Sequence, residues 1–159
     1  KTYDMDIRIT RCVNNYGPNQ NPEKFLPKII TRLMKGENVP IYGNGDNIRE
    51  WIHVDDHCKA ISKVLKLGVR GEIYNVGSGE RISNLGLVKK ILQIMRLPQS
   101  YIEFVLDRPG HDLRYALNSN KARSALDFRP EVSLDQGLED LVAWYSKNVA
   151  WWTDKVTNE

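Results

Sequence analysis

Apolar positions along the chain recur in two patterns, one repeating every second residue and the other every three to four residues. Alternation predicts strands in "EIYNV" and over residues 7–13, 41–42, 48–54 and 101–106. The longer spacing predicts helices over 23–34 and 84–95, and helices capped by Asp55 or Asp56, by Ser119 and by Ser133. Strands and helices interleave without repeats or low-complexity linkers, so the pattern predicts an α/β fold.

The beginning of this pattern suggests that the chain is a fragment. The sequence starts with Lys1 rather than Met and runs at once into the first predicted strand. No G-x-G-x-x-G turn follows any predicted strand, so a complete dinucleotide-binding half is not expected within these 159 residues.

Composition excludes several broad classes of protein. With 41% hydrophobic and 27% charged residues, the chain has the profile of a soluble globular domain. Its net charge of +3 is mild and the charges are scattered, which argues against a nucleic-acid partner. No apolar run reaches the roughly 18 residues of a membrane span and no signal-like segment opens the chain, so we expect a cytoplasmic protein without a membrane partner.

One segment is similar to a metal-binding motif only superficially. "HVDDH" shares its two histidines with the H-E-x-x-H motif, but Val54 occupies the position of the glutamate and His53 falls at a strand end. His53 and His57 therefore cannot share one helix face, and no metal site is expected there.

Two consecutive asparagines follow the first predicted strand. Asn14 and Asn15 offer amide donors and acceptors at the carboxyl end of a strand, where α/β sheets hold ligands. Lys24 adds a positive charge in the first turn of the next predicted helix, which suits a phosphate group. An ordinary polar loop is the alternative for this segment.

The segment "YGNGDNIREW" combines a turn with a candidate anion-binding residue. Asn44-Gly45 favours a tight hairpin between the strands on either side. If Ile48, Trp51 or Ile52 faces a core, the guanidinium of Arg49 is partly desolvated and requires an anion such as phosphate. A plain surface hairpin is the alternative for the turn residues.

The most polar short stretch is "DRPGHDLRY", from Asp107 to Tyr115. Cationic donors, a histidine and an aromatic ring surround a Pro-Gly turn. This combination predicts a site for a phosphorylated, hydroxylated ligand, with a solvated salt-bridge loop as the alternative.

Four segments together resemble a known family. "RCVNNYGPNQNPEKFLPKII", "PIYGNGDNIREWIHVDDH", "GEIYNVGSG" and "DRPGHDLRYALNSNKA" are similar, in order and spacing, to the carboxyl-terminal half of dTDP-glucose 4,6-dehydratases. These belong to the extended short-chain dehydrogenase/reductase superfamily. The resemblance implies that residues 1–159 form the last strands of a Rossmann-like NAD-binding sheet together with the smaller substrate-binding domain.

The resemblance also implies a set of site residues. The positions implied to contact substrate are Asn14, Lys24, Phe25, Pro40, Ile41, Tyr42, Arg49, Asn75, Asp107, Arg108, Pro109, Gly110 and His111. Asn14 and Arg49 correspond to diphosphate contacts, residues 40–42 to the base pocket, and residues 107–111 to a loop over the nucleotide. Phe25 replaces a leucine of the family, and Asn15 corresponds to a contact with the nicotinamide end of NAD.

The family reaction is the NAD-dependent conversion of dTDP-glucose to dTDP-4-keto-6-deoxyglucose. None of the seven tyrosines is followed four residues later by lysine, so the Tyr-x-x-x-Lys pair is missing and no catalytic residue is expected in this chain. We therefore expect the fragment alone to be inactive. The resemblance further implies a homodimer of the full-length enzyme. A UDP- or GDP-sugar dehydratase or epimerase, and a non-catalytic module that binds nucleotide sugars, are the alternatives.

Overall fold

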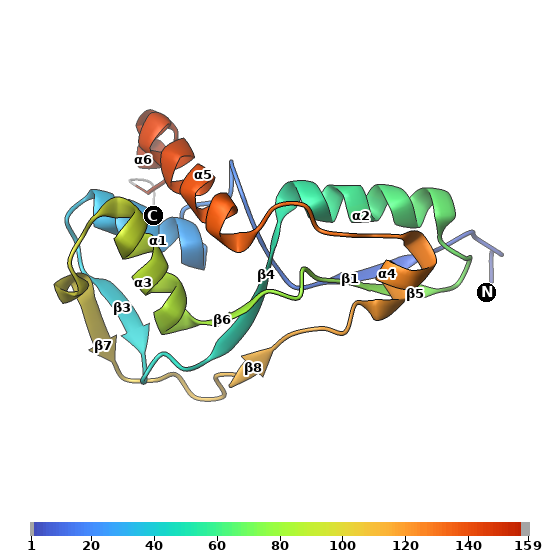
Figure 1. Cartoon of the computed structure of the whole chain (residues 1–159), viewed down its shortest axis with the longest axis horizontal. Coiled ribbons are helices and arrows are strands. Elements are labelled where there is room, and N and C mark those ends of the chain that lie inside the picture. The colour runs from blue at the N-terminus through green and yellow to red at the C-terminus, as the bar shows by residue number, and fades with distance from the viewer. Residues whose placement is uncertain (1, 157–159) are drawn as a thin grey trace.

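The structure is a computed structural model and describes residues 2–156 of the chain (Figure 1). The strands are β1 (Ile9–Cys12), β2 (Asn14–Tyr16), β3 (Val39–Tyr42), β4 (Ile48–His53), β5 (Ile73–Val76), β6 (Arg81–Ser83), β7 (Ile102–Val105) and β8 (Arg114–Tyr115). The helices are α1 (Phe25–Met34), α2 (Val54–Leu67), α3 (Asn84–Met95), a short 3-10 turn (Gln99–Tyr101), α4 (Asn120–Leu126), α5 (Leu134–Lys147) and α6 (Val149–Val156).

The strands form three small sheets. β1 pairs with β5, β3 pairs with β7, and β4 pairs with β2, β6 and β8. All of these pairs are parallel except β4 with β6, which is antiparallel. Helices alternate with the strands along the chain, so the predicted α/β class is confirmed.

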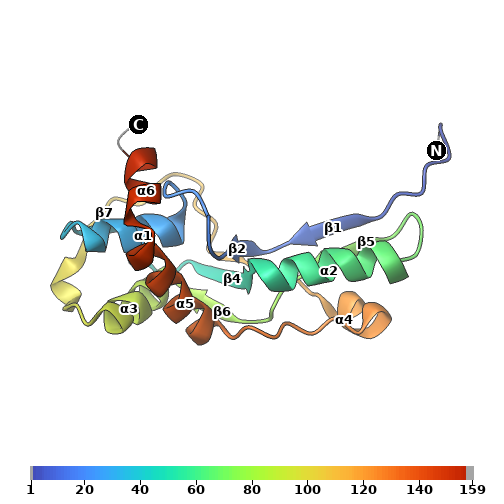
Figure 2. The same cartoon turned by 90° about the horizontal axis from the view of Figure 1, so that it is seen from above.

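Two hydrophobic clusters divide the molecule into two lobes. The helical lobe comprises α1, α3, α5 and α6 with β3 and β7, and its core includes Ile30, Ile91 and Leu138. The sheet lobe comprises β1, β5, α2 and α4, and its smaller core includes Val76 and Phe128. Figures 1 and 2 show the two lobes at opposite ends of an elongated molecule, with β4 running from one toward the other.

Strand β4 connects the two cores through the alternation of its side chains. Successive residues of a strand point to opposite faces. Trp51 joins the core of the helical lobe, whereas its neighbour Ile52 joins the core of the sheet lobe. The strand is therefore buried from both sides over this part of its length.

Three local predictions from the sequence are wrong. Ser119 is the N-cap residue of α4, but its side chain makes no capping hydrogen bond. The turn at Asn44-Gly45 forms, with Gly45 at φ +75°, but β3 and β4 do not pair as a hairpin because they join different sheets. Helix α2 is capped by the side chain of His53, which accepts the amide of Asp55, rather than by either aspartate. The partners of β3 and β4 are decided by tertiary contacts rather than by the turn between the two strands. The cap of α2 is His53 because β4 ends at this residue and α2 begins at the next one.

Other boundaries agree with the pattern of the sequence. Helix α3 spans Asn84–Met95, and the predicted Ser133 cap of α5 accepts the amide of Gln136. The short strands β2, β6 and β8 and the final helix α6 were not predicted. Across residues 2–156, none of the helices combines the length and the apolar character that a membrane crossing would require.

Candidate functional site

A hollow of about 280 Å³ lies between α1, the strands β3 and β4, and the loop from Asp107 to Asp112. Its lining residues are Asn14, Glu23, Phe25, Lys28, Tyr42, Arg49, Trp51, Asn84, Arg108 and His111. Six of them belong to the substrate-contacting set expected from the sequence: Asn14, Phe25, Tyr42, Arg49, Arg108 and His111. Residues from separate segments of the chain thus meet at one place.

Arg49 is the most buried cation of this hollow. Its residue is only 9% exposed, and its Nη1 donates to the carbonyl oxygens of Ile48 and Asp112, both at 2.9 Å. Within residues 2–156, no carboxylate lies within ion-pair distance of its guanidinium. A guanidinium that is desolvated and left without a counter-ion is costly, so this position favours an incoming anion.

The loop that carries Arg108 and His111 is braced from two directions. His111 Nδ1 lies 2.8 Å from Asp107 Oδ1, and this hydrogen bond is the main reason that the pKa of the Asp107 carboxyl falls below its ordinary value. Asn47, which is buried, donates through Nδ2 to the carbonyl of Asp112 at 3.1 Å. The Asp112 carbonyl therefore accepts from both Asn47 and Arg49, which ties the loop to the start of β4.

Aromatic rings form the other walls of the hollow. Phe25 stacks on Trp51 with ring centroids 6.2 Å apart and an interplanar angle of 18°. Tyr42 meets His111 edge to face at 6.4 Å. The site thus combines flat apolar surfaces with cationic groups, as sites for ligands with an apolar ring and an anionic part do.

A smaller apolar hollow of about 70 Å³ adjoins the first. The two share Phe25, Lys28 and Tyr42, and the smaller one is also lined by Pro40, another of the predicted substrate residues. Lys28 therefore lies between the smaller apolar hollow and the larger hollow that contains Arg49.

Several predicted residues lie away from the walls of both hollows. Lys24 is the N-cap residue of α1 and pairs with Glu23 at 2.5 Å. Ile41 is buried in the core of the helical lobe. Asn75 lies on β5 in the sheet lobe and donates to the carbonyl of Asn118 at 3.1 Å. Pro109 and Gly110 form the turn of the loop, where Gly110 adopts a φ of +70°.

Sequence reasoning missed four of the lining residues: Glu23, Lys28, Trp51 and Asn84. Lys28 could have been found by helical spacing, because it lies one turn after Lys24 and Phe25. Trp51 could have been found by strand alternation, because it shares the face of Arg49 on β4. Asn84 carries no sequence signal for this site, since only folding brings the start of α3 beside β4.

The two consecutive asparagines of β2 serve different hollows. Asn14 lines the cationic hollow, whereas Asn15 lines a second one of about 230 Å³ beside Gly17, Gln20 and Val54. Both lie within a strand of their own, in register with Trp51 and Ile52 of β4, rather than in a polar loop after the first predicted strand. Their opposite orientations follow from the alternation of side chains along a strand.

Asn15 carries an unpaired acceptor. Its Nδ2 donates to the carbonyl of Val13 at 3.0 Å, while its Oδ1 is buried and has no partner among the described residues. An amide oxygen that is buried without a donor is uncommon, because most buried polar atoms are hydrogen-bonded.

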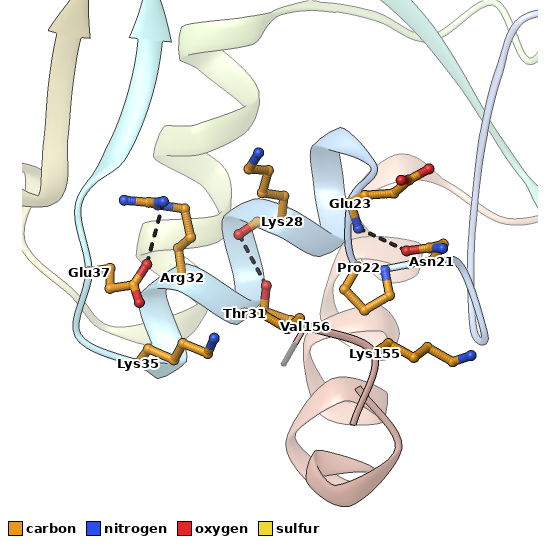
Figure 3. A pocket seen from close by; sticks show the side chains of 10 residues that line it. All are labelled: Asn21, Pro22, Glu23, Lys28, Thr31, Arg32, Lys35, Glu37, Lys155 and Val156. Carbon is orange, nitrogen blue, oxygen red and sulfur yellow. Dashed lines mark hydrogen bonds and ion pairs between the residues drawn. The ribbon is translucent and has the colours of Figure 1, made fainter. Parts of the chain in front are cut away.

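A further hollow, between α1 and α6, is rich in basic residues but is not arranged like a site. Figure 3 shows the side chains of Lys28, Arg32 and Lys155 extending in different directions. Arg32 is also paired with Glu37 at 3.4 Å. The charged groups do not converge on one point, so the hollow around Arg49 is the better candidate.

The sequence of this chain is similar to those of known sugar-nucleotide dehydratases. A family model described as GDP-mannose 4,6 dehydratase matches residues 1–141. A dTDP-glucose 4,6-dehydratase from Actinoplanes sp. is 47% identical over 96% of this chain and 48% of that relative. The chain thus spans about half the length of such relatives.

Solved structures agree with these relatives. The dTDP-glucose 4,6-dehydratase DesIV from Streptomyces venezuelae, determined with NAD bound, superposes with a TM-score of 0.94 at 47% identity, covering 97% of this chain and 48% of that one. A UDP-glucuronic acid 4-epimerase from Bacillus cereus, in complex with UDP-glucuronic acid and NAD, gives a TM-score of 0.83 at 26% identity, covering 90% and 46%.

Proposed function

This chain belongs to the GDP-mannose 4,6 dehydratase family, and from that premise we propose that it is the nucleotide-sugar-binding portion of a dTDP-glucose 4,6-dehydratase. The resemblance to dTDP-glucose 4,6-dehydratases and the extended short-chain dehydrogenase/reductase fold that it implied are confirmed. That the chain corresponds to the carboxyl-terminal half stays a prediction, and so does its division into last sheet strands and substrate domain.

The observation that carries the proposal is the setting of Arg49. This buried guanidinium faces the same hollow as Lys28 and Arg108, and Glu23 is the one carboxylate among the lining residues. Glu23 is itself paired with Lys24, which lowers the pKa of its carboxyl. An excess of positive charge beside a buried, unpaired arginine suits a diphosphate.

The apolar part of the site supports a nucleoside attached to that diphosphate. Phe25, Tyr42 and Pro40 provide flat or apolar contacts next to the cations. Thymine is the base that we propose, because two relatives at 47% identity are named for dTDP-glucose. The family model is named for a GDP-sugar and a structural neighbour holds a UDP-sugar, so these two nucleotides are the alternatives to test.

We infer NAD as the cofactor of the complete enzyme, with Asn15 at its nicotinamide end. Bound NAD supplies the hydride acceptor and donor for conversion of dTDP-glucose to dTDP-4-keto-6-deoxyglucose. The role of this chain is to bind and orient the diphosphate and the base. The catalytic Tyr-x-x-x-Lys pair is expected in the other half of the complete enzyme. We therefore expect this chain to be inactive by itself. A cytoplasmic homodimer is the expected state of the complete protein.

The test is a calorimetric titration of dTDP, UDP and GDP at low salt, into this chain and into the complete protein. The proposal expects dTDP to bind most tightly to the complete protein. Tighter binding of UDP or GDP would transfer the assignment to that nucleotide.

A second assay separates an enzyme from a binding module. The complete protein should convert dTDP-glucose to a 4-keto product, whose formation is followed by absorbance in alkali. Binding of dTDP without turnover would favour the non-catalytic module.

A further inference from the structure

We propose that Glu50 is a positioning residue, which anchors the segment that follows the loop carrying Arg108 and His111. This inference rests on the proposed function for the identity of the ligand. Glu50 does not line the hollow itself, because it follows Arg49 on β4 and successive side chains of a strand point to opposite faces. It was not among the site residues expected from the sequence.

Glu50 is a carboxylate in a fully buried position. Its residue is 0% exposed, yet both of its oxygens are paired. Oε1 accepts the amide of Gly79 at 2.8 Å, and Oε2 accepts the amide of Leu117 at 3.1 Å. The Nε of Arg81, the residue opposite Glu50 in the antiparallel pair of β4 and β6, lies 3.4 Å from Oε2. All three partners are donors, so the carboxylate serves only as an acceptor.

Glu50 and Arg49 hold the same segment of the chain. Arg49 Nη1 donates to the carbonyl of Asp112, and the amide of Leu117 donates to Glu50. Between these two points, β8 pairs with β4 in parallel. Leu117 is bound at both of its backbone polar groups, because its carbonyl also accepts from Arg81 Nη2 at 3.4 Å. The segment is therefore tied to β4 at both of its ends.

The loop between β5 and β6 is shaped around the same carboxylate. A Cβ at Gly77 would lie 2.3 Å from Glu50 Oε1, so a side chain there would displace the carboxylate. Gly79, which donates its amide, has a φ of +90°, a conformation that favours glycine. Ser78 donates from its hydroxyl to the carbonyl of Trp51 at 2.5 Å. Glu50 is thus enclosed by two separate parts of the chain, and its carboxylate joins them.

The cost of this arrangement argues for a role beyond stability. Removing a carboxylate from water is expensive, and a buried ion pair often stabilises a protein no more than apolar residues of similar volume would. Here the carboxylate fixes Leu117, on the segment that leaves the loop. Glu50 therefore orients Arg108 and His111 of that loop toward a bound nucleotide, although its own side chain lies outside the hollow.

The experiment measures dTDP binding by calorimetry and dTDP-glucose turnover on the complete protein. Glu50→Gln keeps the shape of the side chain, but its NH₂ group must then face the amide of either Gly79 or Leu117, donor against donor. Glu103→Gln, at an exposed glutamate on β7, is the matched control. Circular dichroism verifies that each variant is folded.

Glu50→Gln should weaken dTDP binding about tenfold and raise the KM for dTDP-glucose by a similar factor, with kcat nearly unchanged. The reason is that the loop contacts the nucleotide equally in the ground state and in the transition state. Glu103→Gln should match wild type. A fall in apparent kcat with an unaltered KM would overturn the proposal, because a purely structural role only reduces the amount of folded enzyme.

A double-mutant cycle tests whether Glu50 acts through the loop. Arg108→Ala removes a cation from the hollow and should itself weaken dTDP binding. The double variant should lose less affinity than the product of the two single losses, by about threefold or more. Losses that simply multiply would show that Glu50 acts independently of the loop, which would overturn the proposal.

Hydrogen exchange on wild type covers the case in which Glu50→Gln does not fold. The amide of Leu117 should exchange slowly in the free protein, and saturation with dTDP should slow exchange further over residues 113–118. An exchange rate that dTDP leaves unchanged would overturn the positioning role. Failure of wild type to bind dTDP at all would instead count against the proposed function, so the two failures are distinguishable.

Discussion

The helices of the helical lobe and helix α2 of the sheet lobe differ in how much of their apolar surface they bury. In the helical lobe, α1, α3 and α5 pack their apolar faces into one continuous core. In the sheet lobe, β1 and α2 leave Ile9, Ile61 and Leu65 exposed, Leu65 to 71%. Helices α1, α3 and α5 thus bury their apolar faces, although Phe104 on β7 of the same lobe is 59% exposed. Helix α2 of the sheet lobe leaves part of its apolar side uncovered, and exposed apolar faces of this kind mark interaction sites.

The candidate site lies mainly in the helical lobe. Phe25, Lys28 and Tyr42 come from α1 and β3 of the helical lobe, and Arg49 lies on the adjoining strand. Asn15, by contrast, lies at the junction where β2 follows the exposed β1. The difference teaches that the walls of the candidate site come mainly from one lobe and the strand beside it, whereas Asn15 lies in a separate hollow between the lobes.

The largest expected effect tests the two lobes directly. Ile91→Ala removes a side chain with no exposed surface from the helical core and should lower the free energy of unfolding by about 2–5 kcal/mol. Leu65→Ala in the sheet lobe should change it by less than about 0.5 kcal/mol, because that side chain is already exposed. Urea titrations followed by circular dichroism measure both, and losses of similar size would contradict the comparison.

A second prediction concerns binding at the helical lobe. Arg49→Ala should weaken dTDP binding to the complete protein by about 1.5–3 kcal/mol, the scale of a charge-assisted contact. Arg129→Ala, at an exposed arginine paired with Asp127, should leave the dissociation constant unchanged. Calorimetry provides both values, and an unaltered affinity in Arg49→Ala would remove this residue from the site.

A smaller effect is expected from the residue that braces the loop. Asn47→Ala removes one of the two donors to the Asp112 carbonyl and should destabilise the chain by about 1 kcal/mol. Asn38→Ala, at an exposed asparagine just before β3, is the control. Thermal unfolding compares the two variants, and equal midpoints would show that Arg49 alone holds the loop.

The smallest effect is a change with pH in the same loop. Hydrogen bonding to His111 lowers the pKa of the Asp107 carboxyl below its ordinary value of 3.8. The stabilisation is therefore fully present above pH 3.8 and is lost as the pH falls through the lower folded-state pKa. A carbon-13 NMR titration of Asp107 should show this depressed midpoint in wild type. In His111→Ala the midpoint should move back toward 3.8, and an unmoved midpoint would assign the shift to other contacts.

Much of the secondary structure could be read from local pattern. Helices α1, α3 and α5 have regular apolar spacing, and Ser83 and Ser133 have side chains that cap α3 and α5. The hairpin failed because the Asn-Gly turn specifies a local reversal but not the partners of the strands beside it. Strands β6 and β8 were missed because they are only three and two residues long and carry too few positions for a pattern.

The sequence by itself determined the α/β class, the family, and the chemical types that surround the candidate ligand. Motifs such as "NNYGP" and "DRPGHD" place amides, guanidinium groups and aromatic rings in short segments, where their identity is visible without a fold. Only the tertiary structure decided that Lys28 and Asn84 join Arg49 at one hollow, and that Asn14 and Asn15 face different ones. The physical reason is that the chemical type of a side chain can be read at its own position in the sequence. Its burial, and the other side chains that it meets, depend on segments far apart in the chain.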